Sequence, residues 1–163
     1  MITRYDSMIK SAVAKHLPGY DYRLFKAQLW QESKLDPEAI SPAGAEGIGQ
    51  FMPLTWDEWA PRAGFHGVDR RDPKASIFTA AMYMSYLIGE WSWPRPEIDR
   101  HCLALSSYNA GLGHILAAQR QAGNPSLYAE IIKKLPEVTG DHSKETIGYV
   151  KKILGYCSDL VTG

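Results

Sequence analysis

Apolar residues recur along this chain with the three- and four-residue spacing of helices that bury one face. In the clearest run the intervals are four, three, four and three: Ile77, Ala81, Met84, Ile88 and Trp91. The run follows Asp72 and Pro73, an N-capping acid and a proline suited to the first helical position. A similar pattern covers residues 21–33, with Asp21 as the expected N-cap. The pattern therefore predicts amphipathic helices joined by short breakers.

Further helical patterns are separated by proline and glycine breakers. They are expected around residues 8–17, 53–60, 101–108, 115–118, 127–135 and 143–160. We expect the helix at 127–135 to end before Pro136, because proline is poorly tolerated within helices. No segment alternates like a strand, and there are no repeats or long linkers. The sequence predicts a mainly α fold, with residues 1–163 forming a single globular domain.

Composition narrows the choice of partner. The 163 residues include 18 Lys plus Arg and 18 Asp plus Glu, so the net charge is zero. Binding to nucleic acid usually requires a basic patch or a positive excess, so nucleic acid is not expected as a partner. No apolar run is long enough to span a bilayer, so stable membrane insertion is not expected either. We also expect the protein to be a monomer.

One carboxylate has an unusual position. Phe25, Leu29 and Glu32 are spaced i, i+4 and i+7, so Glu32 shares a helix face with two apolar side chains. Removing a carboxylate from water favours its protonated form, which is what a general acid needs. The alternative is that Glu32 simply points into solvent at the helix end.

A glycine-rich segment follows at residues 41–55. Gly44, Gly47 and Gly49 let the backbone approach a ligand, and Gln50 offers an amide between two apolar residues. Taken alone these glycines are ordinary for a loop. A phosphate-binding loop is a poor alternative, because no Gly-Lys-Ser/Thr completes a P-loop and no dinucleotide fingerprint opens a helix.

Four motifs in order resemble the soluble lytic transglycosylase family. They are Glu32-Ser33, the segment from Ser41-Pro-Ala-Gly to Gln50-Phe-Met-Pro53, Tyr108-Asn-Ala-Gly111, and Glu145-Thr146 with Tyr149-Val150. The resemblance covers about residues 20–155 and implies a lysozyme-like fold, shared with goose-type lysozyme, that cleaves peptidoglycan. The family usually has Met where this chain has Gly49, which would enlarge one corner of the groove.

The resemblance also implies a mechanism and a set of site residues. Glu32 would protonate the MurNAc-β-1,4-GlcNAc bond and then act as base on the C6 hydroxyl, leaving a 1,6-anhydromuramoyl end. Substrate-binding roles would fall to these residues: Ser41, Gln50 and Met52 near the N-acetyl sugars, Tyr108 and Asn109 over the cleavage site, and Glu145 and Tyr149 at the far wall. The expected partner is the peptidoglycan glycan strand, and no cofactor is expected.

Each of these roles has an alternative. Taken alone, Tyr108-Asn-Ala-Gly111 is typical of a helix end, Tyr149 of a core aromatic and Glu145 of a surface charge paired with a lysine. The four motifs in order favour the substrate-binding roles. A hydrolytic muramidase would need a second carboxylate to hold water, and Asp36 before Pro37 looks like a loop or cap residue. A third hypothesis is an inactive peptidoglycan-binding or virion structural module, which has no need for an acid at position 32.

Several other residues are expected to lie outside the site. The tryptophans suit either sugar stacking or core packing: Trp56, Trp59, Trp91 and Trp93. Cys102 and Cys157 are expected to be reduced thiols. No metal is expected, because the five histidines lack ligand spacing and Asp69 and Asp72 do not complete a calcium loop.

The first residues contain no signal-peptide pattern, since no apolar stretch follows a basic segment. For a peptidoglycan enzyme this favours a bacteriophage endolysin. Such an enzyme would be made in the host cytoplasm and would act on the cell wall in the periplasm, after holin-dependent release or delivery in a virion. The cargo of a secretion apparatus is an alternative that also fits.

Overall fold

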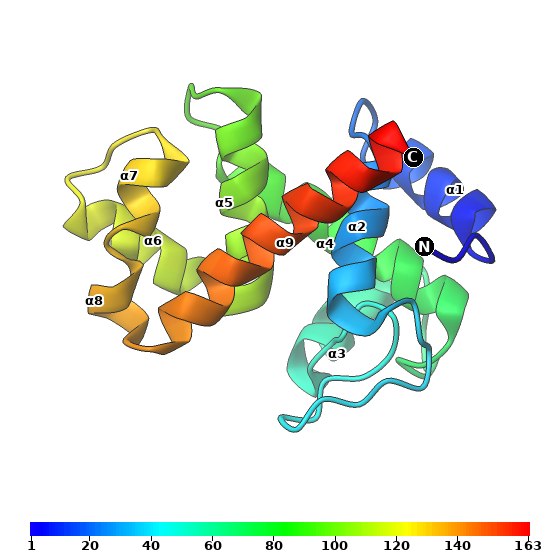
Figure 1. Cartoon of the computed structure of the whole chain (residues 1–163). Helices are drawn as coiled ribbons and strands as arrows, with labels where there is room; N and C mark the ends of the chain where they lie inside the picture. Colours follow the sequence, from blue (N-terminus) through cyan, green and yellow to red (C-terminus); the bar gives the residue numbers. More distant parts are fainter. The chain divides into compact units, whose positions relative to one another are not determined.

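The architecture consists of α-helices joined by loops (Figure 1). The computed structural model describes all 163 residues, and its nine helices are α1 (Asp6–His16), α2 (Tyr22–Ser33), α3 (Pro53–Arg62), α4 (Pro73–Glu90), α5 (Glu97–Ala110), α6 (Leu112–Gln121), α7 (Tyr128–Ile132), α8 (Leu135–Thr139) and α9 (His142–Thr162). The extended pairings are isolated bridges that join Glu46 to Ile40 and to Phe51. None of the helices combines the length and the apolar character that a membrane span requires. The predicted mainly α class is confirmed.

Local signals place the starts of α2 and α4. Asp21 caps α2, because its carboxylate accepts a hydrogen bond from the backbone N–H of Arg23 at 2.9 Å. Asp72 does the same for α4 by accepting from the N–H of Ala75 at 2.8 Å, with Pro73 as the first helical residue. Both predicted caps are confirmed.

The prediction for residues 127–135 was wrong. The structure has two short helices there, α7 and α8, and Pro136 lies in the first turn of α8 instead of following a helix. The N–H groups of a first turn have no partner within the helix, so proline is tolerated at that position. In addition, α5 begins at Glu97, earlier than its apolar pattern indicates.

The chain forms two compact units. The first comprises residues 1–85 and 153–163, and within it α1 packs on α2. Its core includes side chains with no exposed surface, among them Ile9, Phe25, Leu29 and Ile77. The expected single domain stays a prediction.

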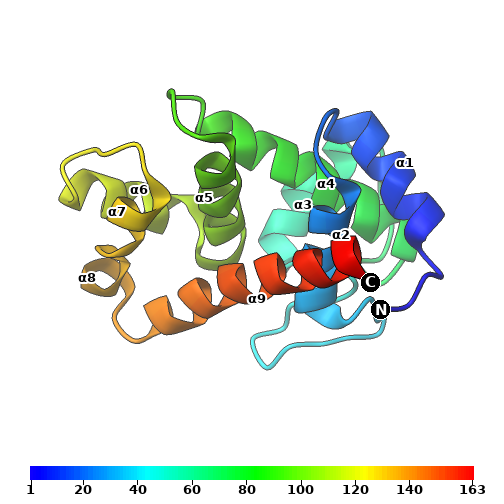
Figure 2. The ribbon, with the colours of Figure 1, turned by 45° about the horizontal axis from the view of Figure 1, so that its top comes forward.

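The second unit comprises residues 86–152. Within it α6 packs against α5, α7 and α8, as Figure 2 shows. Its core includes Leu103, Leu105, Ile115 and Leu135, which have no exposed surface. Each unit carries part of the predicted site.

Candidate active site

The last turn of α2 carries Glu32 in the first unit. Phe25 and Leu29 on the preceding turns have no exposed surface, whereas Glu32 itself is half-buried. The helix ends abruptly because Lys34 and Leu35 take left-handed backbone angles, with φ of 59° and 61°. Glu32 is therefore a carboxylate above a buried apolar face, at a fixed helix end.

The glycine-rich segment is attached to this helix end. Ser33, the neighbour of Glu32, donates a hydrogen bond from its hydroxyl to the carbonyl oxygen of Ile48 at 2.9 Å. The N–H of Gly49 in turn donates to the hydroxyl of Ser76 on α4 at 2.9 Å. These two contacts connect the glycine-rich backbone to α2 and to α4. Gly49 is the position at which the family usually has Met. Its backbone N–H has a structural partner in the Ser76 hydroxyl.

An arginine that the sequence analysis did not predict bonds to three residues of the same segment. The guanidinium of Arg70 donates to the carbonyl oxygens of Gly44 at 3.0 Å and Phe51 at 2.8 Å. It also pairs with the carboxylate of Glu46 at 3.0 Å. A Cβ atom at Gly47 would collide with the carbonyl oxygen of Arg70, so glycine is required at that position by packing and by its φ of 77°.

Two of the predicted substrate-binding side chains form hydrogen bonds inside this segment. The hydroxyl of Ser41 accepts from the N–H of Ala45 at 3.0 Å. The amide nitrogen of Gln50 donates to the carbonyl oxygens of Ala39 at 3.1 Å and Gly47 at 2.9 Å. Both N–H bonds of that amide are therefore engaged in the loop, and its carbonyl oxygen is the group left to accept from a ligand.

Met52 completes the predicted residues of the first unit. It precedes α3 and is 43% exposed. The structure thus brings the end of α2 and the loop that bears Ser41, Gln50 and Met52 into one hydrogen-bonded assembly.

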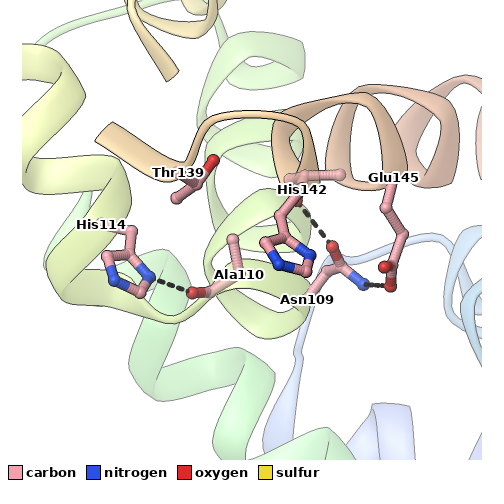
Figure 3. Close-up of a pocket in the computed structure, with 7 residues that line it drawn as sticks. Asn109, Ala110, His114, Thr139, His142 and Glu145 are labelled. Atoms are coloured by element: carbon pink, nitrogen blue, oxygen red, sulfur yellow. Dashed lines mark hydrogen bonds between the residues drawn. The ribbon is translucent and has the colours of Figure 1, made fainter. Parts of the chain in front are cut away.

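The second unit contains a pocket of about 350 Å³ that includes two predicted residues, Asn109 and Glu145 (Figure 3). The Asn109 amide nitrogen donates to the Glu145 carboxylate at 3.4 Å, and its carbonyl oxygen accepts from the hydroxyl of Thr146 at 2.8 Å. The other residues that line the pocket are Ala110, His114, Thr139, His142 and Thr146 itself. The Glu145 carboxylate and the Thr146 hydroxyl together hold the Asn109 amide in this orientation, which leaves one of its N–H bonds for a ligand.

The two histidines of this pocket were not predicted. His114 on α6 places Nδ1 at 2.7 Å from the carbonyl oxygen of Ala110, so Nδ1 is the donor and carries a proton (Figure 3). His142 is the first residue of α9. The two residues lie 28 positions apart in the sequence, and no spacing motif connects them.

The remaining predicted residues do not line the pocket. Tyr149 is only 4% exposed and Tyr108 is half-buried. No group of three or more His, Cys, Asp or Glu side chains is arranged to hold a metal ion. Cys102 and Cys157 are both unpaired thiols, Cys102 buried and Cys157 half-buried.

Comparison with known proteins decides the family. The family model of the transglycosylase SLT domain matches residues 9–131, most of the chain. The chain belongs to the transglycosylase SLT domain family. The predicted family is thus confirmed.

Curated relatives of this SLT domain are longer proteins named membrane-bound lytic murein transglycosylase F. The protein from Alcanivorax borkumensis is 37% identical over 136 residues, which are 81% of this chain and 27% of the relative. The protein from Alteromonas mediterranea is 29% identical over 175 residues, which are 98% of this chain and 36% of the relative. The chain therefore spans about a third or less of these relatives.

Solved structures share the fold. The 70 kDa soluble lytic transglycosylase of Escherichia coli matches with a TM-score of 0.74 and 23% identity, over 94% of this chain and 23% of that one. An inactive Glu→Gln mutant of the lytic transglycosylase Slt from Pseudomonas aeruginosa matches with a TM-score of 0.75 and 24% identity, over 94% and 23%. The expected lysozyme-like fold of a lytic transglycosylase catalytic domain is confirmed.

Proposed function

We propose that this SLT domain is a peptidoglycan lytic transglycosylase that cleaves the MurNAc-β-1,4-GlcNAc bond. The observation that carries the proposal is the position of Glu32, half-buried at the end of α2 and next to the Ser33 hydroxyl that holds the glycine-rich segment. The names of the curated relatives agree with this activity. The inactive Glu→Gln mutant of the Pseudomonas protein agrees with one essential glutamate.

In the proposed reaction Glu32 acts twice. Its carboxyl proton passes to the glycosidic oxygen as the bond to the muramic acid C1 breaks, and GlcNAc leaves with a free 4-hydroxyl. The carboxylate then removes the proton from the C6 hydroxyl of the same muramic acid, whose oxygen bonds to C1. The product is a 1,6-anhydromuramoyl end, and no water is consumed.

One carboxylate suffices for this sequence of steps. The surroundings of Asp36, the nearest other acid in the sequence, indicate a structural role for it. Asp36 is exposed and accepts a hydrogen bond from the backbone N–H of Glu38 at 2.9 Å, as expected for a residue that shapes a turn. The hydrogen bond to Glu38 therefore explains the presence of Asp36 without a catalytic role. A hydrolytic muramidase would instead need Asp36, or another acid, to hold the attacking water.

The remaining predicted residues bind the glycan in this proposal. The Gln50 carbonyl oxygen and exposed Met52 contact N-acetyl sugars, and Ser41 supports the loop. Asn109, oriented by Thr146, donates to a sugar oxygen, and Glu145 accepts from a hydroxyl. In this proposal the Tyr108 hydroxyl lies over the cleavage site, and Tyr149, which is 4% exposed, supports the far wall together with Glu145.

The test is mass spectrometry of fragments released from purified peptidoglycan by the wild type and by Glu32→Gln. We expect the wild type to release anhydro products, lighter by one water than hydrolytic ones and resistant to borohydride. Glu32→Gln should remain folded and release almost none, because an amide keeps the shape but donates no such proton. Reducible products of full mass would indicate a muramidase, and no products from folded wild type would indicate a binding module.

Delivery to the cell wall is a separate proposal. We retain the endolysin hypothesis, in which the enzyme is a monomer that reaches the periplasm through holin pores or with a virion. Expression in a Gram-negative host tests it: lysis should require coexpression of a holin. Lysis without the holin would contradict it, and light scattering after gel filtration tests the monomer.

A further inference from the structure

A second pocket in the residue 86–152 unit is formed by the segment between α4 and α5 together with the end of α6. Its volume is about 400 Å³, and it is lined by Glu90, Trp91, Ser92, Trp93, Arg95, Gln119 and Asn124. Its two tryptophans differ sharply, since Trp91 is 1% exposed and Trp93 is 72% exposed. Trp91 is a core residue, whereas Trp93 offers most of its indole to solvent.

The backbone that carries Trp93 is held in place by its neighbours. Arg95 donates to the carbonyl oxygen of Trp93 at 3.1 Å and to that of Ser126 at 2.9 Å. Its guanidinium also lies 5.2 Å from the centre of the Trp91 ring. The carbonyl oxygen of Trp91 accepts from Arg100 at 3.0 Å. The exposed indole is therefore presented from an ordered segment, so less conformational entropy is lost when a ligand binds.

Polar groups suited to an amino sugar line the same pocket. The amide nitrogen of Gln119 donates to the carbonyl oxygen of Pro125 at 3.2 Å, which leaves the side-chain oxygen as an acceptor. Asn124 has a left-handed backbone, with φ of 60°, and its exposed amide both donates and accepts. Glu90 adds an exposed carboxylate that accepts from hydroxyl groups.

We propose that this pocket is an accessory binding site for the N-acetylated glycan of peptidoglycan. A sugar ring stacks its C–H face on Trp93, and its hydroxyl and N-acetyl groups bond to Gln119, Asn124 and Glu90. The choice of glycan rests on the proposed function, which makes this polymer the substrate. Binding here keeps the enzyme on an insoluble wall between cleavage events.

The accessory site is distinct from the pocket of Asn109 and Glu145. Trp93 precedes the first residue of α5, and Asn109 is the penultimate residue of that 14-residue helix. A helix of this length is about 20 Å long, so the two pockets lie at opposite ends of α5. A short glycan fragment bound at one end leaves the other free.

The experiment measures binding of the full chain to purified peptidoglycan sacculi by cosedimentation, in a Glu32→Gln background that prevents digestion. Trp93→Ala is compared with the parent and with Ile98→Ala, which removes another apolar side chain, 53% exposed, at the same end of α5 but outside the pocket. We expect Trp93→Ala to weaken binding about three- to tenfold, the effect of losing one stacked aromatic contact. Ile98→Ala should bind like the parent, and Trp93→Phe should recover most of the affinity.

A second variant tests the polar half of the site. Asn124→Gly removes the amide while glycine accepts the left-handed backbone, so the fold is retained. We expect a severalfold loss of binding to sacculi with an unchanged thermal melting curve. Unchanged binding by both Trp93→Ala and Asn124→Gly would overturn the site.

Cleavage assays with otherwise wild-type protein separate this proposal from the proposed function. Trp93→Ala should release fewer products from sacculi, yet cleave a soluble tetrasaccharide fragment like the wild type. An equal loss on both substrates would place the pocket in the cleavage site and overturn the accessory role. If Trp93→Ala lowers sacculus binding but the wild type cleaves neither substrate, the proposed function fails and the binding site stands.

Discussion

The hydroxyl of Ser33 donates a hydrogen bond to the carbonyl oxygen of Ile48, 15 residues away, at 2.9 Å. Both residues are buried, and Ile48 has no exposed surface. This bond joins the residue that follows Glu32 to the middle of the glycine-rich segment. The position of the proposed acid therefore depends on a loop that the α2 pattern does not include.

Removing this bond should impair catalysis without unfolding the protein. Ser33→Ala leaves the buried Ile48 carbonyl oxygen without its side-chain donor, so we expect a loss of about 1–2 kcal/mol in the free energy of unfolding. Displacement of the adjacent Glu32 should lower kcat by roughly tenfold or more. Denaturant titration and initial rates on soluble muropeptides measure the two effects.

Ser11→Ala provides the matched control. The exposed Ser11 hydroxyl donates to the carbonyl oxygen of Ser7 at 2.9 Å, within α1. Because both groups remain solvated, the change should cost less than about 0.5 kcal/mol and leave kcat intact. Equal kcat values for the two alanine variants would show that the Ser33 bond does not position Glu32.

Alanine should destabilise the protein much less at Gly44 than at Gly47, although both glycines have left-handed backbone angles. Gly44 and Gly47 both have positive φ, 90° and 77°, but only at Gly47 does a Cβ atom meet the Arg70 carbonyl oxygen. We expect Gly44→Ala to cost about 1 kcal/mol for the backbone alone. Gly47→Ala should cost about 3 kcal/mol or more, because strain and collision add. Thermal unfolding of the two variants gives the difference, and similar melting temperatures would contradict the close approach of Arg70.

The orientation of Asn109 should depend on Thr146. Thr146→Val keeps the shape but removes the donor to the Asn109 carbonyl oxygen, and the side chain is only 3% exposed. We expect KM for soluble muropeptides to rise about three- to tenfold, with kcat less affected, since an amide free to flip binds the sugar less well. Thr162→Val is the control, because Thr162 is exposed and bonds within α9 to Ser158. An unchanged KM in Thr146→Val would exclude this orienting role.

The two cysteines should differ in reactivity. Burial raises the pKa of the Cys102 thiol to about 11, with Asp99 adding to the effect, and burial also raises the pKa of half-buried Cys157. A raised pKa means less thiolate, so at pH 8 only about one Cys102 in a thousand is ionised. A thiol reagent should therefore modify Cys157 first, and the slow Cys102 reaction should accelerate as pH rises toward 11. The Cys157→Ser variant should lack the fast reaction and keep the slow one. Rapid modification that persists in this variant would contradict the assignment of the fast reaction to Cys157.

Much of the helical framework follows from local sequence. The Asp21 cap, the Asp72-Pro73 start and the spacing of Phe25 and Leu29 each involve residues within about one helical turn, so neighbouring residues alone indicate them. The wrong prediction at Pro136 also has a local cause. A proline disfavours the interior of a helix but suits the first turn of one, so the sequence pattern fits either position.

Only the tertiary structure decided how the chemical groups meet. Arg70 lies 26 residues from Gly44, Thr146 lies 37 from Asn109, and His114 and His142 come to one pocket from different helices. No periodic pattern connects such pairs. The sequence by itself determined most of the helices, the family motifs and the choice of Glu32 as the proposed acid, because these are indicated by neighbouring residues. The partners of Ser33, Gln50 and Asn109, and the exposure of Trp93 beside buried Trp91, depend on packing between distant segments, which is fixed only when the whole core forms.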